Sequence, residues 1–138
     1  QRNDFSTFDT FCHTQLIMQS KILVVENDQD ILDIITIILE DQGYKVIASI
    51  YSSIIEDISI IQPDLIMLDH VVMNGSGSDI CKEIKANPVT NNIPVILLST
   101  AVGLQQITED ACADGFIEKP FDIDYLGELI TDHLHRLA

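Results

Sequence analysis

Three short stretches of the sequence are apolar at every position, and they constrain the fold more than any other feature. They span residues 22–25, 65–68 and 95–98. A strand that is apolar on both faces must be covered on both faces, which is typical of central strands in a parallel sheet between two layers of helices. Shorter strands are expected at residues 44–48 and 116–117. The sequence therefore predicts a five-stranded parallel sheet.

Segments with a helical spacing of apolar residues lie between these strands. The residues that define the expected helices are Ile31, Ile35 and Ile38, then Ile54, Ile58 and Ile61, then Ile80, Cys81 and Ile84, then residues 104–113, and finally Ile123, Leu126, Ile130, Leu134 and Leu137. Strands that alternate with helices in this way favour a doubly wound α/β sandwich of five strand–helix units.

Residues 1–20 differ from the rest of the chain because they contain no strand-like run and no clear turn signal. Within them, Phe5, Phe8, Phe11 and Leu16 recur at a near-helical spacing. We interpret this stretch as an N-terminal extension, which is a leader, a tag remnant or a short amphipathic segment that docks on a partner. The patterned domain is placed at residues 21–138, a length typical of one domain.

The charge balance excludes several classes of function. Seven Lys and Arg residues stand against 22 Asp and Glu residues, which gives a formal net charge of −15. Such a surface repels phosphate backbones and anionic lipids, so direct binding of nucleic acid or of a membrane is not expected. The three cysteines, Cys12, Cys81 and Cys112, form no CxxC motif. This pattern argues against a disulfide scaffold or a zinc site and favours a cytoplasmic location.

Polar side chains follow the expected strands at the point where each strand ends. The groups in question are Glu26 and Asn27 after the first strand, Asp69 after the third, Ser99 after the fourth and Lys119 after the fifth. Because the carboxyl ends of parallel strands meet at one edge of a sheet, these groups should surround one crevice. Carboxylate and amide oxygens suit Mg²⁺, and a lysine with a hydroxyl suits phosphoryl oxygens. Asp69 is then placed as a carboxylate nucleophile that could form an acyl phosphate.

At these residues the chain resembles the receiver domain of response regulators in two-component signalling, and in particular the chemotaxis regulators. The matching stretches are, in order, KILVVENDQDIL, PDLIMLDHVVMNGSG, IPVILLSTA and DGFIEKPFD. The resemblance covers residues 21–138. It implies a flavodoxin-like (βα)5 sandwich with the strand order 2-1-3-4-5. It also implies a signalling switch, not an enzyme with a substrate of its own, that accepts a phosphoryl group from a histidine kinase or phosphotransfer protein and acts on a downstream protein.

The resemblance assigns roles to the residues that match the motifs. Asp69 looks like the phosphoacceptor, and Lys119 and Ser99 look like the groups that hold the phosphoryl oxygens. The expected ligands of Mg²⁺, or of Mn²⁺ in its place, are Glu26, Asn27, Asp69 and the backbone carbonyl of Val71.

The resemblance also implies a conformational switch. Ser99 and Phe116 look like the pair of side chains that move on phosphorylation. Their movement would remodel the surface formed by the fourth helix, the fifth strand and the fifth helix. The bond between Lys119 and Pro120 is expected to be cis, a form that is uncommon even before proline.

One position departs from the family pattern in a way that affects the chemistry. Asn27 stands where the family usually has an Asp that binds the metal directly, so we expect a weaker affinity for Mg²⁺. The same residue leaves open a second interpretation, a pseudo-receiver that docks on partners without being phosphorylated. A third interpretation, a flavin binder of similar architecture, would need a cradle of Gly, Ser or Thr amides after the first strand, where this chain has Glu26, Asn27 and Asp28.

Overall fold

The computed structural model describes residues 19–72, 75–100 and 103–136. Most of the expected N-terminal extension, including Phe5, Phe8, Phe11 and Leu16, therefore lies outside the described residues. The elements along the chain are β1 (Lys21–Val25), α2 (Gln29–Asp41), β2 (Lys45–Ser49), the 3-10 helix η1 (Ser52–Asp57), α3 (Ile58–Ile61), β3 (Leu65–Asp69), β4 (Val71–Val72), β5 (Gly75–Ser76), α4 (Gly77–Ala86), β6 (Val95–Ser99), α5 (Leu104–Asp110), β7 (Gly115–Glu118) and α6 (Ile123–Arg136).

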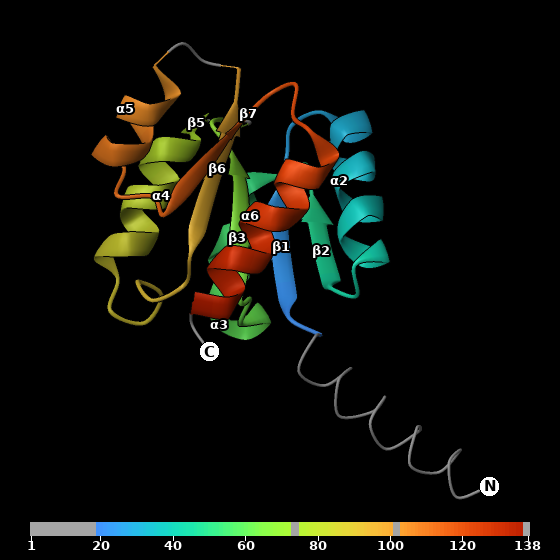
Figure 1. Ribbon diagram of the computed structural model, residues 1–138. Coiled ribbons are helices and arrows are strands. Elements are labelled where there is room, and N and C mark those ends of the chain that lie inside the picture. The colour runs from blue at the N-terminus through green and yellow to red at the C-terminus, as the bar shows by residue number, and fades with distance from the viewer. Residues whose placement is uncertain (1–18, 73–74, 101–102, 137–138) are drawn as a thin grey trace, which may run out of the picture.

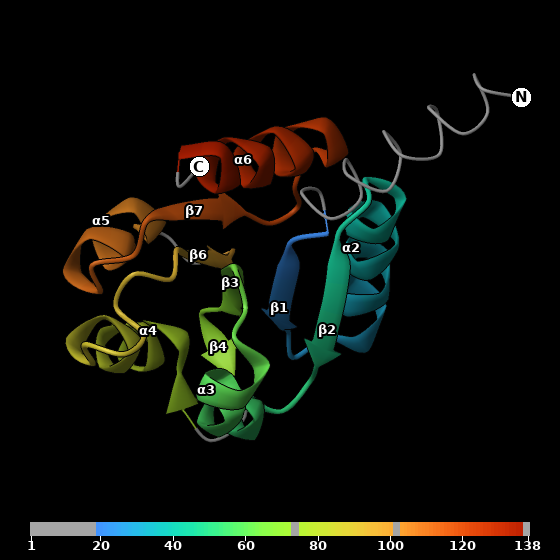
Figure 2. The same ribbon diagram turned by 90° about the horizontal axis from the view of Figure 1, so that it is seen from below.

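Five of these strands form one parallel sheet in the order β2-β1-β3-β6-β7, with helices on both sides (Figures 1 and 2). This confirms the expected doubly wound fold, because the order is 2-1-3-4-5 when the sheet strands alone are numbered. Figure 2 shows α2 and α6 on one face, and η1, α3, α4 and α5 on the other. No helix in the described ranges is both long enough and apolar enough to cross a membrane.

The apolar runs are explained by two separate cores, one on each face of the sheet. Successive residues of β1 alternate between them: Ile22 and Val24 pack with α2 and α6, whereas Leu23 and Val25 pack with α3 and α4. All four side chains are fully buried. Such burial stabilises a domain by about 1.5–3 kcal/mol for each large aliphatic side chain, as an upper estimate.

Helix α2 has a side-chain N-cap, and its buried residues differ in part from the expected ones. The side chain of Asp28 accepts hydrogen bonds from the backbone N–H groups of Asp30 (2.9 Å) and Ile31 (3.2 Å), which makes it the N-cap. The residues buried under the helix are Leu32, Ile35 and Leu39, so the expected Ile35 is confirmed, whereas Leu32 and Leu39 take the places expected for Ile31 and Ile38. Ile31 and Ile38 pack at the margin of the same core.

Two helices are shorter than the sequence pattern predicts. The expected helix around Ile58 is a 3-10 turn followed by the single α-turn of α3, which ends at Gln62 with φ 53°. The helix expected over residues 104–113 ends at Asp110, because Cys112 takes a left-handed conformation with φ 59°. A small antiparallel pair, β4 with β5, was not expected at all.

The β4–β5 pair places Gly77 against the end of the central strand. The N–H of Gly77 donates a hydrogen bond to the carbonyl oxygen of His70 (2.6 Å). A Cβ atom added at Gly77 would collide with the backbone carbonyl oxygen of Asp69. A glycine is therefore required where α4 starts beneath the end of β3.

We expect Gly77→Ala to lower the free energy of unfolding by about 2 kcal/mol, because the added methyl group displaces the backbone at Asp69. Gly75→Ala is the matched control, since a Cβ at Gly75 would meet nothing within 4 Å. Its effect should stay within about 0.5 kcal/mol. Urea denaturation followed by circular dichroism measures both, and equal effects of the two substitutions would contradict the steric argument.

Candidate functional site

Four strands of the sheet deliver the expected polar residues to one edge. Glu26 follows β1, Asp69 ends β3, Ser99 ends β6, and Lys119 follows β7. The backbone keeps these ends in register: the N–H of Glu26 donates to the carbonyl of Ser49 (3.1 Å), and the N–H of Lys119 donates to the carbonyl of Ser99 (3.1 Å). The upper end of the sheet in Figure 1 is this carboxyl edge.

The ammonium group of Lys119 lies between two carboxylates. Its Nζ is 2.7 Å from Oε1 of Glu26 and 3.5 Å from Oδ2 of Asp69. Glu26 is 0% exposed and Asp69 is 4% exposed, so neither carboxylate is screened well by water. A short contact with an ammonium group is stronger in such a sheltered place than at an open surface.

Backbone N–H groups also point at the Asp69 carboxylate, which the sequence did not predict. The N–H of Val71 donates to Oδ1 (3.2 Å), and the N–H of Asn27 makes a longer contact of 3.4 Å with Oδ2. The Asn27 N–H also donates to Oε2 of Glu26 (3.1 Å). Residue types carry no signal for such contacts, because every residue except proline has an N–H group.

Burial controls the electrostatics of Glu26. The pKa of Glu26 is raised to about 8: removal from water is the largest cause, the neighbouring carboxyl group of Asp69 acts in the same direction, and Lys119 acts against them. Two carboxyl groups around a single lysine leave an excess of negative charge in a sheltered place. Such a place favours a proton or an additional cation.

The donor chemistry of this edge fits a hard divalent cation. Mg²⁺ typically takes one or two carboxylates and completes its shell with water and other oxygens. Glu26 and Asp69 would supply the carboxylates, and Asn27, whose side chain is exposed, would add an amide oxygen. The described residues contain no group of three or more His, Cys, Asp or Glu side chains arranged for a metal. A cation here would therefore also depend on other oxygen donors, such as the amide oxygen of Asn27. The role of the Val71 backbone carbonyl as a metal ligand stays a prediction.

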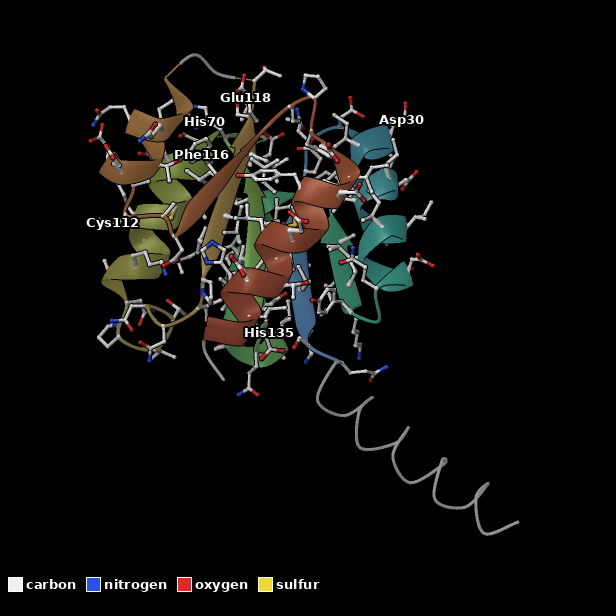
Figure 3. The ribbon with its side chains drawn as sticks, in the orientation of Figure 1. Asp30, His70, Cys112, Phe116, Glu118 and His135 are labelled. Atoms are coloured by element: carbon white, nitrogen blue, oxygen red, sulfur yellow. The ribbon has the colours of Figure 1, made fainter. Side chains whose placement is uncertain are left out.

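The expected switch residues flank this cluster. Ser99 is 4% exposed at the end of β6, and Phe116 is half-buried on β7 opposite Leu97. The bond between Lys119 and Pro120 is cis, as the resemblance implies. Figure 3 shows Phe116 and His70 toward the carboxyl edge and His135 near the opposite end of the molecule. The movement of Ser99 and Phe116 stays a prediction.

An apolar groove opens beside the cluster. Its volume is about 290 Å³, and its lining residues are Ile31, Ile34, Lys119, Pro120, Phe121 and Ile123. Ile34 and Ile123 remain 48% and 55% exposed. The groove thus joins an exposed apolar surface to the lysine of the site, a combination that the sequence pattern did not reveal because its residues come from two distant segments.

Comparison with known proteins identifies the family. Residues 22–131 match the model of the response regulator receiver domain. The phosphate regulon transcriptional regulatory protein PhoB of Escherichia coli K12 is 35% identical over 125 residues, which cover 88% of this chain and 54% of that protein. The DNA-binding dual master transcriptional regulator RpaA of Synechocystis is 32% identical over 119 residues, covering 84% of this chain and 49% of that protein. The chain thus spans about half the length of these curated relatives.

The chain is also similar to solved structures. The signal receiver domain of a signal transduction histidine kinase from Syntrophus aciditrophicus is 28% identical with a TM-score of 0.78, covering 84% of this chain and 90% of that one. A putative response regulator from Chloroflexus aurantiacus has a TM-score of 0.80 at 21% identity, covering 84% of this chain and 98% of that one, and shows a likeness of fold.

The raised pKa of Glu26 predicts that cation binding depends on pH. A bound cation favours the ionised carboxylate, so the affinity for Mg²⁺ should rise with pH up to about 8, by at most about tenfold per pH unit, and then level off. Isothermal titration calorimetry between about pH 6 and pH 9 measures it. In Glu26→Gln the affinity should be lower and the pH dependence should flatten. A wild-type affinity that does not change with pH would contradict this assignment.

The charge that is missing at Asn27 gives a separate prediction. Asn27→Asp should raise the affinity for Mg²⁺ by about tenfold, which corresponds to about 1.4 kcal/mol, because a third carboxylate joins the site. The same calorimetric titration at one pH measures the change. Asp28→Asn, at the neighbouring N-cap, should leave the affinity within about twofold, since Asn is an equally good cap. An unchanged affinity in Asn27→Asp would show that this side chain does not bind the cation.

Proposed function

The chain belongs to the response regulator receiver domain family, and we propose that it is a phosphoacceptor switch in which Asp69 accepts a phosphoryl group. The donor would be a histidine kinase or a histidine phosphotransfer protein, and Mg²⁺ or Mn²⁺ would be the required cofactor. The domain would act in the cytoplasm on a downstream protein. It would assist only its own phosphorylation and dephosphorylation.

The contact between Asp69 and Lys119 carries this proposal. The carboxylate ends the central strand and is held from two sides by N–H groups, while Lys119 Nζ lies 3.5 Å from Oδ2. Lys119 can therefore offset the repulsion between Asp69 and an incoming phosphoryl group. Phosphoryl transfer needs little more from a protein than such positioning and charge neutralisation.

The proposed reaction is a single transfer. An oxygen of Asp69 bonds to phosphorus as the P–N bond of the donor's phosphohistidine breaks, and an acyl phosphate results. Lys119 and Ser99 would hold the phosphoryl oxygens. A divalent cation on Glu26, Asn27 and Asp69 would supply further charge neutralisation.

The apolar groove supports a protein as the donor. It ends at Lys119 and continues into the exposed side chains of Ile34 and Ile123. A donor that rests on this groove would bring its phosphohistidine to the adjacent carboxylate. Nucleic acid is not proposed as a partner, because the net charge of −15 repels it.

Incubation with acetyl phosphate and Mg²⁺ tests the phosphoacceptor directly. Intact-mass spectrometry should show the gain of one phosphoryl group in the wild-type protein and no gain without Mg²⁺. Asp69→Asn should show no gain, because an amide is not a nucleophile of this kind. Lys119→Gln should slow the reaction by about 100-fold or more, the usual order for the loss of one electrostatic group.

Asp41→Asn is the matched control, since Asp41 is exposed at the far end of α2. It should be phosphorylated like the wild-type protein. No gain of mass in the wild-type protein at saturating donor and Mg²⁺ would refute the proposal and would favour the pseudo-receiver. A gain that persists in Asp69→Asn would refute the assignment of the residue.

A further inference from the structure

A second groove opens on the face of the sheet that lies away from α2 and α6. Helices α3 and α4 are on this face (Figure 2), and the groove runs between the η1–α3 segment and α4. Its volume is about 470 Å³. We call it the α3–α4 groove, and its apolar and charged lining residues are Ile55, Ile58, Ile84, Val89, Glu56 and Glu83. None of them belongs to the cluster around Asp69 and Lys119.

The floor of the groove belongs to the core, whereas apolar side chains at its rim are open to water. Ile58 and Ile84 on the floor are buried and pack in the core of this face. Val89 is 75% exposed, and Ile60, in the same turn as Ile58, is 80% exposed. These are the two largest exposed fractions of any large apolar side chain in the described ranges. Exposed apolar side chains around a concave site are typical of a surface that another segment covers.

The described part of the chain begins close to this groove. The N–H of Lys21 donates to Oδ2 of Asp64 (2.7 Å), and its Nζ donates to the carbonyl oxygen of Ile61 (2.7 Å), the last residue of α3. The first residue of α3, Ile58, lines the groove. Because α3 is 4 residues long, its two ends are about 6 Å apart. Residues 1–18 therefore join the domain within about one helical turn of the groove.

The sequence of residues 1–18 matches the groove in its apolar side chains and in its charge. The residues that recur in it at a near-helical spacing are Phe5, Phe8, Phe11 and Leu16. Segments that place an apolar face into a groove use such a spacing. Residues 10–18 contain no Asp, Glu, Lys or Arg, so the acidic side chains of Glu56 and Glu83 do not repel them. About two or three extended residues span the length of α3, so the segment can reach the groove.

We propose that residues 5–18 dock in the α3–α4 groove of the same chain and cover the apolar side chains at its rim. The covalent connection favours this occupant, because a segment joined beside its binding site has an effective concentration of about 1 mM. A twofold symmetric contact between two copies would bring Glu56 and Glu83 of both rims together, which costs binding free energy. Docking of the segment requires no phosphoryl group, so it goes beyond the proposed function and does not depend on it.

A nitroxide spin label within the segment tests where the segment lies. The full chain carries Thr14→Cys for the label, together with Cys12→Ala and Cys112→Ser. The remaining thiol, that of Cys81, is fully buried and does not compete for the label. Nuclear magnetic resonance of the isotope-labelled protein then shows which backbone amide signals are lost through proximity to the nitroxide and return when the nitroxide is reduced.

We expect the lost signals to come from the α3–α4 groove. They should include the amides of Ile55, Ile58 and Ile84, and they should not include the amides of α2 on the other face of the sheet. No loss of signal in the groove would overturn the proposal. Loss confined to another surface would also overturn it and would locate the segment there.

Two matched substitutions test the apolar contact. Val89→Asp places a carboxylate at the rim of the groove, whereas Ile37→Asp makes the same type of change at a 67% exposed position of α2. Docking would bury the new charge at Val89, so the ratio of docked to free segment should fall by about tenfold or more and the lost signals should return. Ile37→Asp should leave the loss of signal unchanged. Circular dichroism establishes that both variants are folded, and equal effects of the two would overturn the proposal.

A mixed sample distinguishes docking within one chain from docking between two copies. A spin-labelled chain without the isotope is mixed with an isotope-labelled chain without the spin label. At about 0.1 mM of each chain, about tenfold below the effective concentration within one chain, the groove signals should be retained. Their loss in the mixture would overturn the proposal and would assign the groove to the segment of a second copy. All of these measurements use the unphosphorylated protein, so their outcome is independent of whether Asp69 accepts a phosphoryl group.

Discussion

Two buried carboxylates that share one ammonium group are the interaction on which the rest of the site depends. Glu26 and Asp69 come from strands β1 and β3, and Lys119 follows β7 at the edge of the sheet. The contact therefore ties together segments that are far apart in the sequence. It exists because the parallel sheet aligns the carboxyl ends of its strands, and it stays strong because neither carboxylate is open to water.

The sequence predicted those parts of the fold and site that depend on residue type. Runs buried on both faces located the central strands, and the polar residues that follow them located Glu26, Asp69 and Lys119. Helix bounds were predicted less well because backbone conformation decides them: α5 ends early where Cys112 becomes left-handed, and the stripe of α2 is displaced from Ile38 to Leu39. Propensity and periodicity are weak guides to such details.

Contacts made by the backbone could not be predicted at all. The N–H groups of Asn27 and Val71 reach Asp69 because the chain turns there, and Gly77 is needed because α4 begins against the carbonyl of Asp69. The groove beside Lys119 could not be predicted either, because it combines residues of α2 with residues around the start of α6.

The charges of the site suggest how phosphorylation would reach the surface formed by α5, β7 and α6. A phosphoryl group on Asp69 would replace about one negative charge by about two. Lys119 now lies 2.7 Å from Glu26 and farther from Asp69, so it would have to turn from one to the other in order to hold the phosphoryl group. Lys119 directly follows β7, and its N–H is bonded to Ser99. A shift of this lysine would therefore act directly on β7, the strand that carries Phe116 and lies between α5 and α6 along the chain.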